Sequence, residues 1–189
     1  AFIFAFILPV LLFSPKHVSA AYDCSSTSIP ITECNALVNL HAMTFGSGWT
    51  NSTNWLVPGF DPCTWYGITC SGGHVTAIIL GSNNLVGNLP AEMGDFTNLL
   101  TLHLNNNWIT GPIPPTLANV TTLTSLWLAY NQFQLNIIPQ FGTYWTNMTD
   151  LWLAHNQLSS TLPSTMGNMT SLTYLDLSYN SFTGSIPPE

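Results

Sequence analysis

A motif that returns about every 24 residues constrains this chain more than any other feature. Its fullest form, residues 99–114, places leucine or isoleucine at fixed positions and ends in Gly-Pro-Ile-Pro. One asparagine of each copy marks the period, with spacings of 24, 24, 25 and 24 residues: Asn83, Asn107, Asn131, Asn156 and Asn180. A unit this short cannot bury its own apolar face, so the units must stack into a solenoid with a long concave sheet. The pattern predicts an α/β solenoid, a right-handed superhelix, and narrows the function to recognition.

The first half of each unit, Leu-x-x-Leu-x-Leu, predicts a short strand, as in residues 123–128. Side chains alternate across a strand, so Leu126 and Leu128 should point inward. Successive units then pair as a parallel sheet, and the outward positions of this unit are Ser125, Trp127 and Ala129. The marker asparagines are predicted to be structural, because an asparagine side chain can hydrogen-bond backbone groups where the chain turns off the sheet.

The second half of each unit, Leu-x-Gly-x-Ile-Pro, predicts an extended segment in place of a regular helix. Glycine allows the backbone to bend, and proline interrupts both a helix and a strand ladder. Short helical turns should follow, for example at residues 115–118. Two units depart from this pattern: Ser160 replaces the glycine in one, and residues 133–139 carry one extra residue and no glycine in the other. We expect a local bulge at the extra residue.

The two ends of the chain indicate a secreted protein that continues beyond this sequence. Residues 2–13 form an apolar run too short for a membrane span, and residues 18–20, Val-Ser-Ala, fit a cleavage pattern of small residues. Residues 1–20 are therefore predicted to be a signal peptide without its initiator methionine; a buried core helix is the alternative. The sequence stops inside a repeat at Glu189, where a complete solenoid would carry a polar cap.

The chain has almost no positive charge for binding polyanions. Lys16 is the one basic residue, against eight Asp and Glu residues, and charged residues make up 5% of the chain, compared with about 25% in a typical domain. Nucleic-acid binding requires basic side chains that neutralise phosphates, so it is excluded. No cofactor or metal motif is present. Four Asn-x-Ser/Thr sequons are predicted glycosylation sites on exposed loops: Asn51, Asn119, Asn147 and Asn168.

All four cysteines lie before the first repeat. An even number in a secreted chain favours disulfides over a metal. Three pairings are possible, and the low entropic cost of closing short loops favours Cys24–Cys34 and Cys63–Cys70. Zinc is the alternative, although the chain lacks a tight Cys-x2-Cys pair.

The segment around these cysteines, residues 21–73, is predicted to cap the first leucine layer. Apolar residues near helical spacing predict a helix that begins after Thr32 as a capping residue and ends at residues 46–48, Gly-Ser-Gly. An exposed leucine layer needs an apolar cover, so three tryptophans of this segment are predicted to pack and not to bind: Trp49, Trp55 and Trp65.

The array resembles the plant-type leucine-rich repeat, written LxxLxLxxNxLxGxIPxxLxxLxx. Residues 61–70, Asp-Pro-Cys-Thr-Trp-Tyr-Gly-Ile-Thr-Cys, are similar to the Pro-Cys-x-Trp-x-Gly-Val-x-Cys box that precedes such arrays. The family includes ectodomains of receptor-like kinases and receptor-like proteins, polygalacturonase-inhibiting proteins and some ice-binding proteins. The resemblance covers residues 32–189 and implies extracellular recognition on the concave face and a Cys63–Cys70 disulfide. We expect a signal peptide at 1–20, a cap at 21–73, and five repeats at 74–189, the last incomplete.

The outward positions of the sheet hold the candidate ligand-binding residues. A solvent-facing sheet does not need two neighbouring tryptophans to fold, and exposed aromatic patches commonly mark recognition sites. The small residues Ala129, Ala154 and Ser178 should leave a groove beside them. The alternatives are that the tryptophans only stabilise each other, or that an absent part of the chain covers them. The predicted contacts are Trp127, Trp152, Tyr130, Tyr174, His155, Asp150, Asp176, His103 and Tyr179.

The leading functional hypothesis is the ectodomain of a receptor-like protein or kinase that binds a peptide, a protein or a neutral glycan. A co-receptor would be a second partner, and a membrane anchor or a kinase domain would follow Glu189. The alternatives are a secreted glycosidase inhibitor and, third, an ice-binding protein, which would need a flat array of small polar groups. Catalysis is not expected, because the Asp and His side chains share an open face without an enclosed pocket that would shift a pKa.

Overall fold

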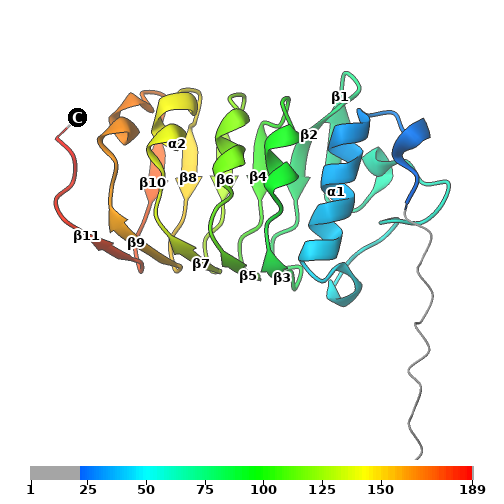
Figure 1. Ribbon diagram of the computed structural model, residues 1–189, viewed down its shortest axis with the longest axis horizontal. Coiled ribbons are helices and arrows are strands. Elements are labelled where there is room, and N and C mark those ends of the chain that lie inside the picture. The colour runs from blue at the N-terminus through cyan, green and yellow to red at the C-terminus, as the bar shows by residue number, and fades with distance from the viewer. Residues whose placement is uncertain (1–21, 189) are drawn as a thin grey trace, which may run out of the picture.

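The computed structural model describes residues 22–188, and the predicted signal peptide lies outside this range. The chain winds into a solenoid with a sheet on each of two sides and helices on a third (Figure 1). The first sheet has six strands in the order β1-β2-β4-β6-β8-β10, and all neighbours are parallel except the β1–β2 pair of the cap. The predicted solenoid with a parallel sheet is confirmed. Its strands are β1 Ile68–Ser71, β2 His74–Ile79, β4 Thr101–His103, β6 Ser125–Trp127, β8 Asp150–Trp152 and β10 Tyr174–Asp176.

The leucines of consecutive repeats stack in register beneath this sheet. Leu102 lies opposite Leu126, and Leu126 lies opposite Leu151. All three side chains are buried. Burying one leucine side chain contributes about 1.5–3 kcal/mol, so each added layer stabilises both neighbours. The 24-residue period therefore fixes which side chains face the interior and which face solvent.

A second sheet runs along the adjacent side of the solenoid, in the order β11-β9-β7-β5-β3. The sequence predicts these segments as extended but gives no sign that they pair. Ser160 adopts the left-handed backbone (φ 80°) that Gly111 (φ 76°) adopts in another repeat. Leu135, in the unit with the extra residue, also has a positive φ of 70°, which agrees with the expected irregularity. The strands are β3 Val86–Asn88, β5 Trp108–Gly111, β7 Gln132–Leu135, β9 Gln157–Thr161 and β11 Ser181–Thr183.

The third side carries one helical turn or short helix per repeat, as Figure 1 shows. The turn predicted at residues 115–118 is present as η5, Pro115–Asn119. Proline opens it, since the missing N–H of proline is tolerated in the first turn of a helix. The other elements of the array are η4 Ala91–Asp95, α2 Pro139–Tyr144 and η6 Ser164–Asn168.

The marker asparagines bridge neighbouring repeats. The Oδ1 atom of Asn131 accepts a hydrogen bond from the backbone N–H of Ile109, one repeat earlier, at 3.0 Å. Its Nδ2 group donates to the carbonyl of Leu104 at 2.9 Å and to that of Leu128 at 3.1 Å. The sequence predicts bonds within the turn; the bonds to the preceding repeat are an additional finding.

The cap covers the first leucine layer. It comprises η1 Cys24–Ser26, α1 Ile31–Met43, η2 Gly46–Gly48, η3 Pro62–Thr64 and β1. The prediction that Thr32 caps α1 is wrong: the helix already begins at Ile31 after Pro30, with no side-chain cap bond. It also ends earlier than predicted, at Met43, where the N–H of Thr44 bonds the carbonyl of Leu40.

Disulfides and aromatic rings hold the cap together. The structure pairs Cys24 with Cys34 and Cys63 with Cys70. Trp49, Trp55 and Trp65 are buried and contact one another through their rings, as the packing prediction requires. The buried carboxylate of Glu33 joins α1 to the first repeat through His74 Nδ1 and the N–H of Val75, both at 2.7 Å.

Candidate ligand-binding face

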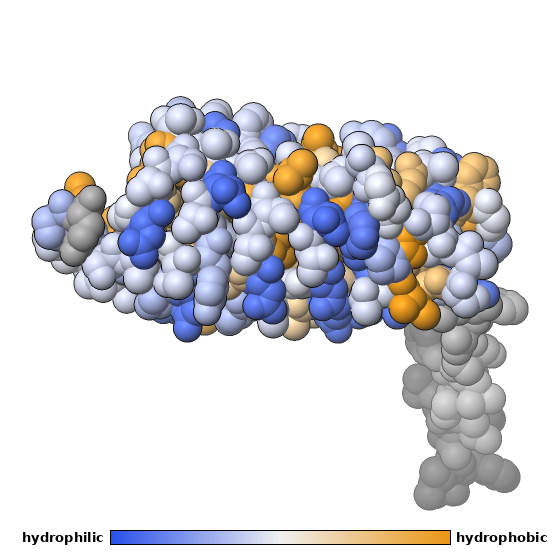
Figure 2. Space-filling view, turned by 90° about the horizontal axis from the view of Figure 1, so that it is seen from above, coloured by the Kyte–Doolittle hydropathy of each residue, from blue (hydrophilic) through white to orange (hydrophobic). Residues whose placement is uncertain are grey.

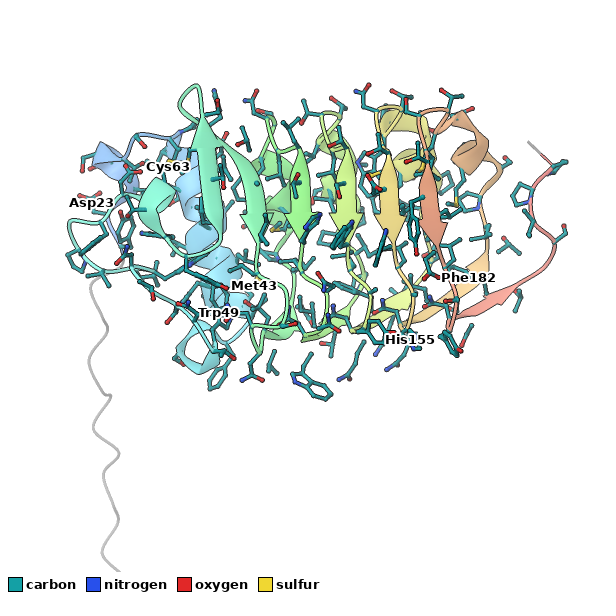
Figure 3. All side chains as sticks on the ribbon, turned by 180° about the vertical axis from the view of Figure 1, so that it is seen from behind. Asp23, Met43, Trp49, Cys63, His155 and Phe182 are labelled. Carbon is teal, nitrogen blue, oxygen red and sulfur yellow. A yellow bond between two sulfur atoms is a disulfide. The ribbon has the colours of Figure 1, made fainter. Side chains whose placement is uncertain are left out.

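The predicted ligand-binding residues lie on the solvent-facing side of the six-stranded sheet, called the concave face below. Figure 3 views the molecule from this side. The register places one outward residue of each strand in a line across the sheet. We call this line the central row: Ile79, His103, Trp127, Trp152 and Asp176.

Aromatic rings of the central row stack on one another. The centroid of His103 lies 4.0 Å from that of Trp127, which lies 4.6 Å from that of Trp152. Tyr174, which lies on β10 two residues before Asp176, continues the stack, with its ring centroid 4.5 Å from that of Trp152. Stacked aromatic pairs contribute about 0.5–1.5 kcal/mol beyond area burial. The alternative interpretation, that the two tryptophans stabilise each other, is therefore partly correct, since their rings are stacked.

The two tryptophans also carry an energetic cost. Their side chains are half-buried, and within residues 22–188 neither indole Nε1 atom has a hydrogen-bond partner although both atoms are inaccessible to solvent. Leaving a buried donor unpaired costs about 1–3 kcal/mol. Phenylalanine would stack without this cost, although it would bury less apolar surface than tryptophan.

A second line of side chains follows the residue before each marker asparagine. We call it the turn row: Ser82, Asn106, Tyr130, His155 and Tyr179. All five have a positive φ, between 52° and 56°. Asparagine tolerates this left-handed conformation, whereas a bulky side chain adopts it at a cost of about 1–3 kcal/mol. The rings of Tyr130, His155 and Tyr179 stack at 4.2 and 4.0 Å.

Two aspartates lie opposite aromatic residues of the sheet, Asp150 opposite Tyr174 and Asp176 opposite Trp152. Asp150 accepts a hydrogen bond from the hydroxyl of Thr149 at 2.6 Å. Asp176 accepts from the hydroxyl and the N–H of Ser178 at 2.7 and 3.0 Å, which lowers the pKa of its carboxyl. Partial burial lowers the pKa of His103, and the nearby Asp150 opposes this shift. At neutral pH this part of the face is therefore negative and hydrogen-bonding.

Of the small residues predicted to leave a groove beside the tryptophans, Ala129 and Ala154 are 2% and 3% exposed and lie in the floor of the sheet, whereas Ser178 is exposed. A hollow lies at the edge where the chain leaves the first sheet for the second. It has a volume of about 420 Å³ and is lined in part by Tyr130, His155 and Trp108. Figure 3 places His155 at this edge.

Trp108 is the site residue that the sequence interpretation missed. It opens β5 and is 58% exposed. The motif leaves the position after the marker asparagine unspecified, and Gln132 and Gln157 occupy it in the next two repeats. A tryptophan at a position with no core requirement was the signal available in the sequence.

Two of the four predicted glycosylation sites lie on the helical side of the solenoid. Asn119 and Asn168 end the turns η5 and η6, on the helical side, and both are exposed. The side seen from above in Figure 2 has hydrophilic residues along its whole length. Among residues 22–188, no helix is long and apolar enough to cross a membrane and no cluster of His, Cys, Asp and Glu could hold a metal.

Comparison with known proteins agrees with this fold. The family model described as Leucine Rich Repeat matches residues 98–120, 147–169 and 171–189. The crystal structure of a Pollen Receptor Kinase 3 superposes with a TM-score of 0.65 at 32% identity, covering 79% of this chain and 74% of that one. This chain belongs to the plant leucine-rich repeat receptor proteins.

Two further matches extend the comparison for this leucine-rich repeat protein. Protein STRUBBELIG-RECEPTOR FAMILY 3 of Arabidopsis thaliana is 32% identical over 135 residues, which are 70% of this chain and 17% of that protein. The plant peptide hormone receptor RGFR1, solved in complex with RGF2, is 32% identical with a TM-score of 0.58, covering 59% of this chain and 18% of that one. The leucine-rich repeat chain therefore spans less than a fifth of these two longer relatives.

Proposed function

We propose that this chain is the extracellular recognition module of a receptor-like protein or kinase and that it binds a peptide or protein ligand on its concave face. The central row carries the proposal. Its two tryptophans stack on each other and, with Tyr174, form a run of aromatic rings that a solvent-facing sheet does not need in order to fold. Aromatic residues are enriched among the residues that dominate binding energy at protein interfaces.

The charge of the face defines the ligand further. The sequence after Lys16 contains no Lys or Arg, so no bidentate guanidinium clamp can hold a ligand carboxylate. Asp150 and Asp176 instead offer carboxylates beside the ring edges of Trp152 and Tyr174. A neutral or basic peptide that crosses the strands would meet apolar ring edges and hydrogen-bond acceptors together.

The relatives support the same function. RGFR1 is described as a peptide hormone receptor, and this chain resembles its repeat region. We infer that the present chain acts outside the cell, as a binding and not a catalytic segment. The open sheet favours this function, because it offers no enclosed pocket in which a catalytic group would be desolvated.

Peptides selected from a random library on the purified wild-type protein test the proposal. Trp127→Ala and Trp152→Ala should each raise the Kd of selected peptides about 30-fold or more, the effect of losing an interface residue that supplies ~2 kcal/mol. Tyr144→Ala is the matched control, since Tyr144 is an exposed aromatic residue on α2 and should leave the Kd unchanged.

A folding check accompanies the binding assay. Trp127→Phe keeps the stack and removes the unpaired N–H, so this variant should unfold at the same or a higher temperature than wild type. Selected peptides whose Kd is unaffected by both alanine variants would place the ligand site elsewhere and reject the central row.

A further inference from the structure

The hollow at the edge of the concave face is bordered by one end of an aromatic stack. In the turn row, His155 stacks on one side of Tyr130 at 4.2 Å. The next member of the row on the other side is Asn106, which carries no ring. One face of the phenol of Tyr130 therefore borders the hollow, whereas the tryptophan faces of the central row are covered by their neighbours.

Trp108 forms a second apolar wall. Its side chain is 58% exposed and starts the strand β5, directly after the marker Asn107. The N–H of Asn107 bonds the carbonyl of Tyr130 at 3.1 Å, so the backbone fixes Trp108 beside Tyr130. The hollow thus has two aromatic walls supplied by two neighbouring repeats.

Side-chain amides also line the hollow. Asn106 and Gln132 both border the hollow, and within residues 22–188 no hydrogen bond occupies either side-chain amide. An amide presents a carbonyl acceptor and an N–H donor together. No carboxylate lines the hollow, and Lys or Arg is absent from the whole chain after Lys16. The lining, which also includes the imidazole of His155, therefore favours an occupant that is neutral and that both donates and accepts hydrogen bonds.

We infer that this hollow is a binding subsite for a neutral sugar residue of a glycan. A sugar ring offers a C–H face to the free face of Tyr130 and to Trp108, and its hydroxyls can pair with Asn106 and Gln132. An apolar peptide side chain would fill the aromatic walls but leave both amides without partners, which lowers affinity. The volume of about 420 Å³ lies within the range of about 300–1,000 Å³ typical of small-molecule sites.

The subsite does not depend on the proposed peptide site, because the tryptophans of the central row do not line it. The two proposals can therefore fail separately. Variants at Trp108 and Gln132 test the sugar subsite, and variants at Trp127 and Trp152 test the peptide site.

Binding of neutral and acidic oligosaccharides to the whole purified chain tests the inference. The probes are cello-, xylo-, manno- and N-acetylglucosamine oligomers, with oligogalacturonate as the acidic comparison, and the readout is calorimetry together with saturation-transfer NMR. At least one neutral oligomer should bind, and the acidic oligomer should bind at least about tenfold more weakly. Trp108→Ala should raise the Kd of the neutral oligomer about tenfold or more.

Two further variants separate the ring contacts from the hydrogen bonds. Tyr130→Asn keeps a residue that tolerates the left-handed backbone, as Asn106 does, and removes the ring; it should also raise the Kd about tenfold. Gln132→Leu conserves volume without the amide and should weaken binding severalfold. The control Tyr144→Ala should have no effect.

Absence of binding by every neutral oligomer would overturn the inference, as would a bound oligomer whose Kd is unchanged in Trp108→Ala and Tyr130→Asn. If these two variants instead abolish binding of the selected peptides, the hollow belongs to the peptide site and the sugar assignment is wrong.

Discussion

At the scale of single residues, the marker asparagines join the repeats in a way that leucine packing alone does not. Each carbonyl oxygen of these side chains accepts an N–H from the preceding repeat, as Asn107, Asn156 and Asn180 also show. The amide nitrogens of these three residues bond carbonyls of their own and of the preceding repeat, whereas Asn83, the first marker, bonds the N–H and the carbonyl of Asn51 in the cap. An asparagine is therefore both the end of one turn and a tether to the turn before it.

Replacing one of these residues should cost far more than its small size suggests. Asn131→Ala leaves the buried N–H of Ile109 without its acceptor. It also removes one of the two side-chain amide donors of the Leu104 and Leu128 carbonyls, which keep the donors of Asn107 and Asn156. An unsatisfied buried group costs about 1–3 kcal/mol, so the free energy of unfolding should fall by about that much. Urea unfolding measures it; Asn136→Ala, at an exposed asparagine, is the control and should change stability by less than about 0.5 kcal/mol. If both variants lowered the free energy of unfolding equally, the hydrogen bonds of Asn131 to the preceding repeat would not contribute to stability.

The same scale shows what the sequence could predict about the site. Strand alternation correctly placed Trp127 and Trp152 on the concave face, because the 24-residue period fixes the register. Alternation failed for Ala129, since a position on the outer side of a strand can still be covered by side chains of neighbouring repeats. It also missed Trp108, because the pairing of β5 that orients this residue arises between repeats and not within one.

At the scale of elements, the helical side depends on close approach between successive turns. A Cβ atom added at Gly94 in η4 would lie 2.4 Å from the carbonyl oxygen of Thr116 in η5. An added Cβ at Gly142 in α2 would lie 2.3 Å from the carbonyl oxygen of Thr165 in η6. Backbone cannot yield as the end of a side chain can, so glycine sets the spacing of these turns.

Gly94→Ala should therefore separate η4 from η5 and lower the melting temperature. Overpacking of this kind costs about 1–3 kcal/mol. Gly81→Ala is the matched control: its Cβ would meet only the side chain of Asn105, at 2.9 Å, and the equivalent position of later repeats is already alanine, in Ala129 and Ala154. Thermal unfolding followed by circular dichroism compares the two. A Gly94→Ala protein as stable as Gly81→Ala would show that the turns can slide apart without cost.

The two sheets differ in how far they could be predicted from the sequence. The first sheet was predictable because a leucine pattern with period two identifies each strand. The second sheet was not, because β3 and β5 each carry a glycine that indicates only an extended backbone, and β7, β9 and β11 contain neither glycine nor proline. Their hydrogen bonds exist because the first sheet and the stacked leucines already hold successive repeats side by side.

At the scale of the whole molecule, acid should destabilise both the cap and the concave face. Burial lowers the pKa of His41, which lies against Trp49 and Trp55 in the cap, and lowers that of His103 in the central row. Burial alone would raise the pKa of Asp61, but hydrogen bonds from Ser28 and Cys63 outweigh it and lower that pKa. A lowered pKa means that the folded protein binds a proton less readily than the unfolded chain.

Stability should therefore fall as the pH falls, in two steps. The contribution of His41 and His103 is complete above their ordinary pKa of 6.5 and is lost as the pH drops through their lower folded values. That of Asp61 is complete above 3.8 and is lost below it. The melting temperature should decline as the pH falls below 6.5, and His41→Phe with His103→Phe should flatten this decline while leaving the one below pH 3.8. Each single variant should remove part of the first step, because His41 lies in the cap and His103 lies in the central row on β4. An unaltered slope in the double variant would assign the acid sensitivity to other groups.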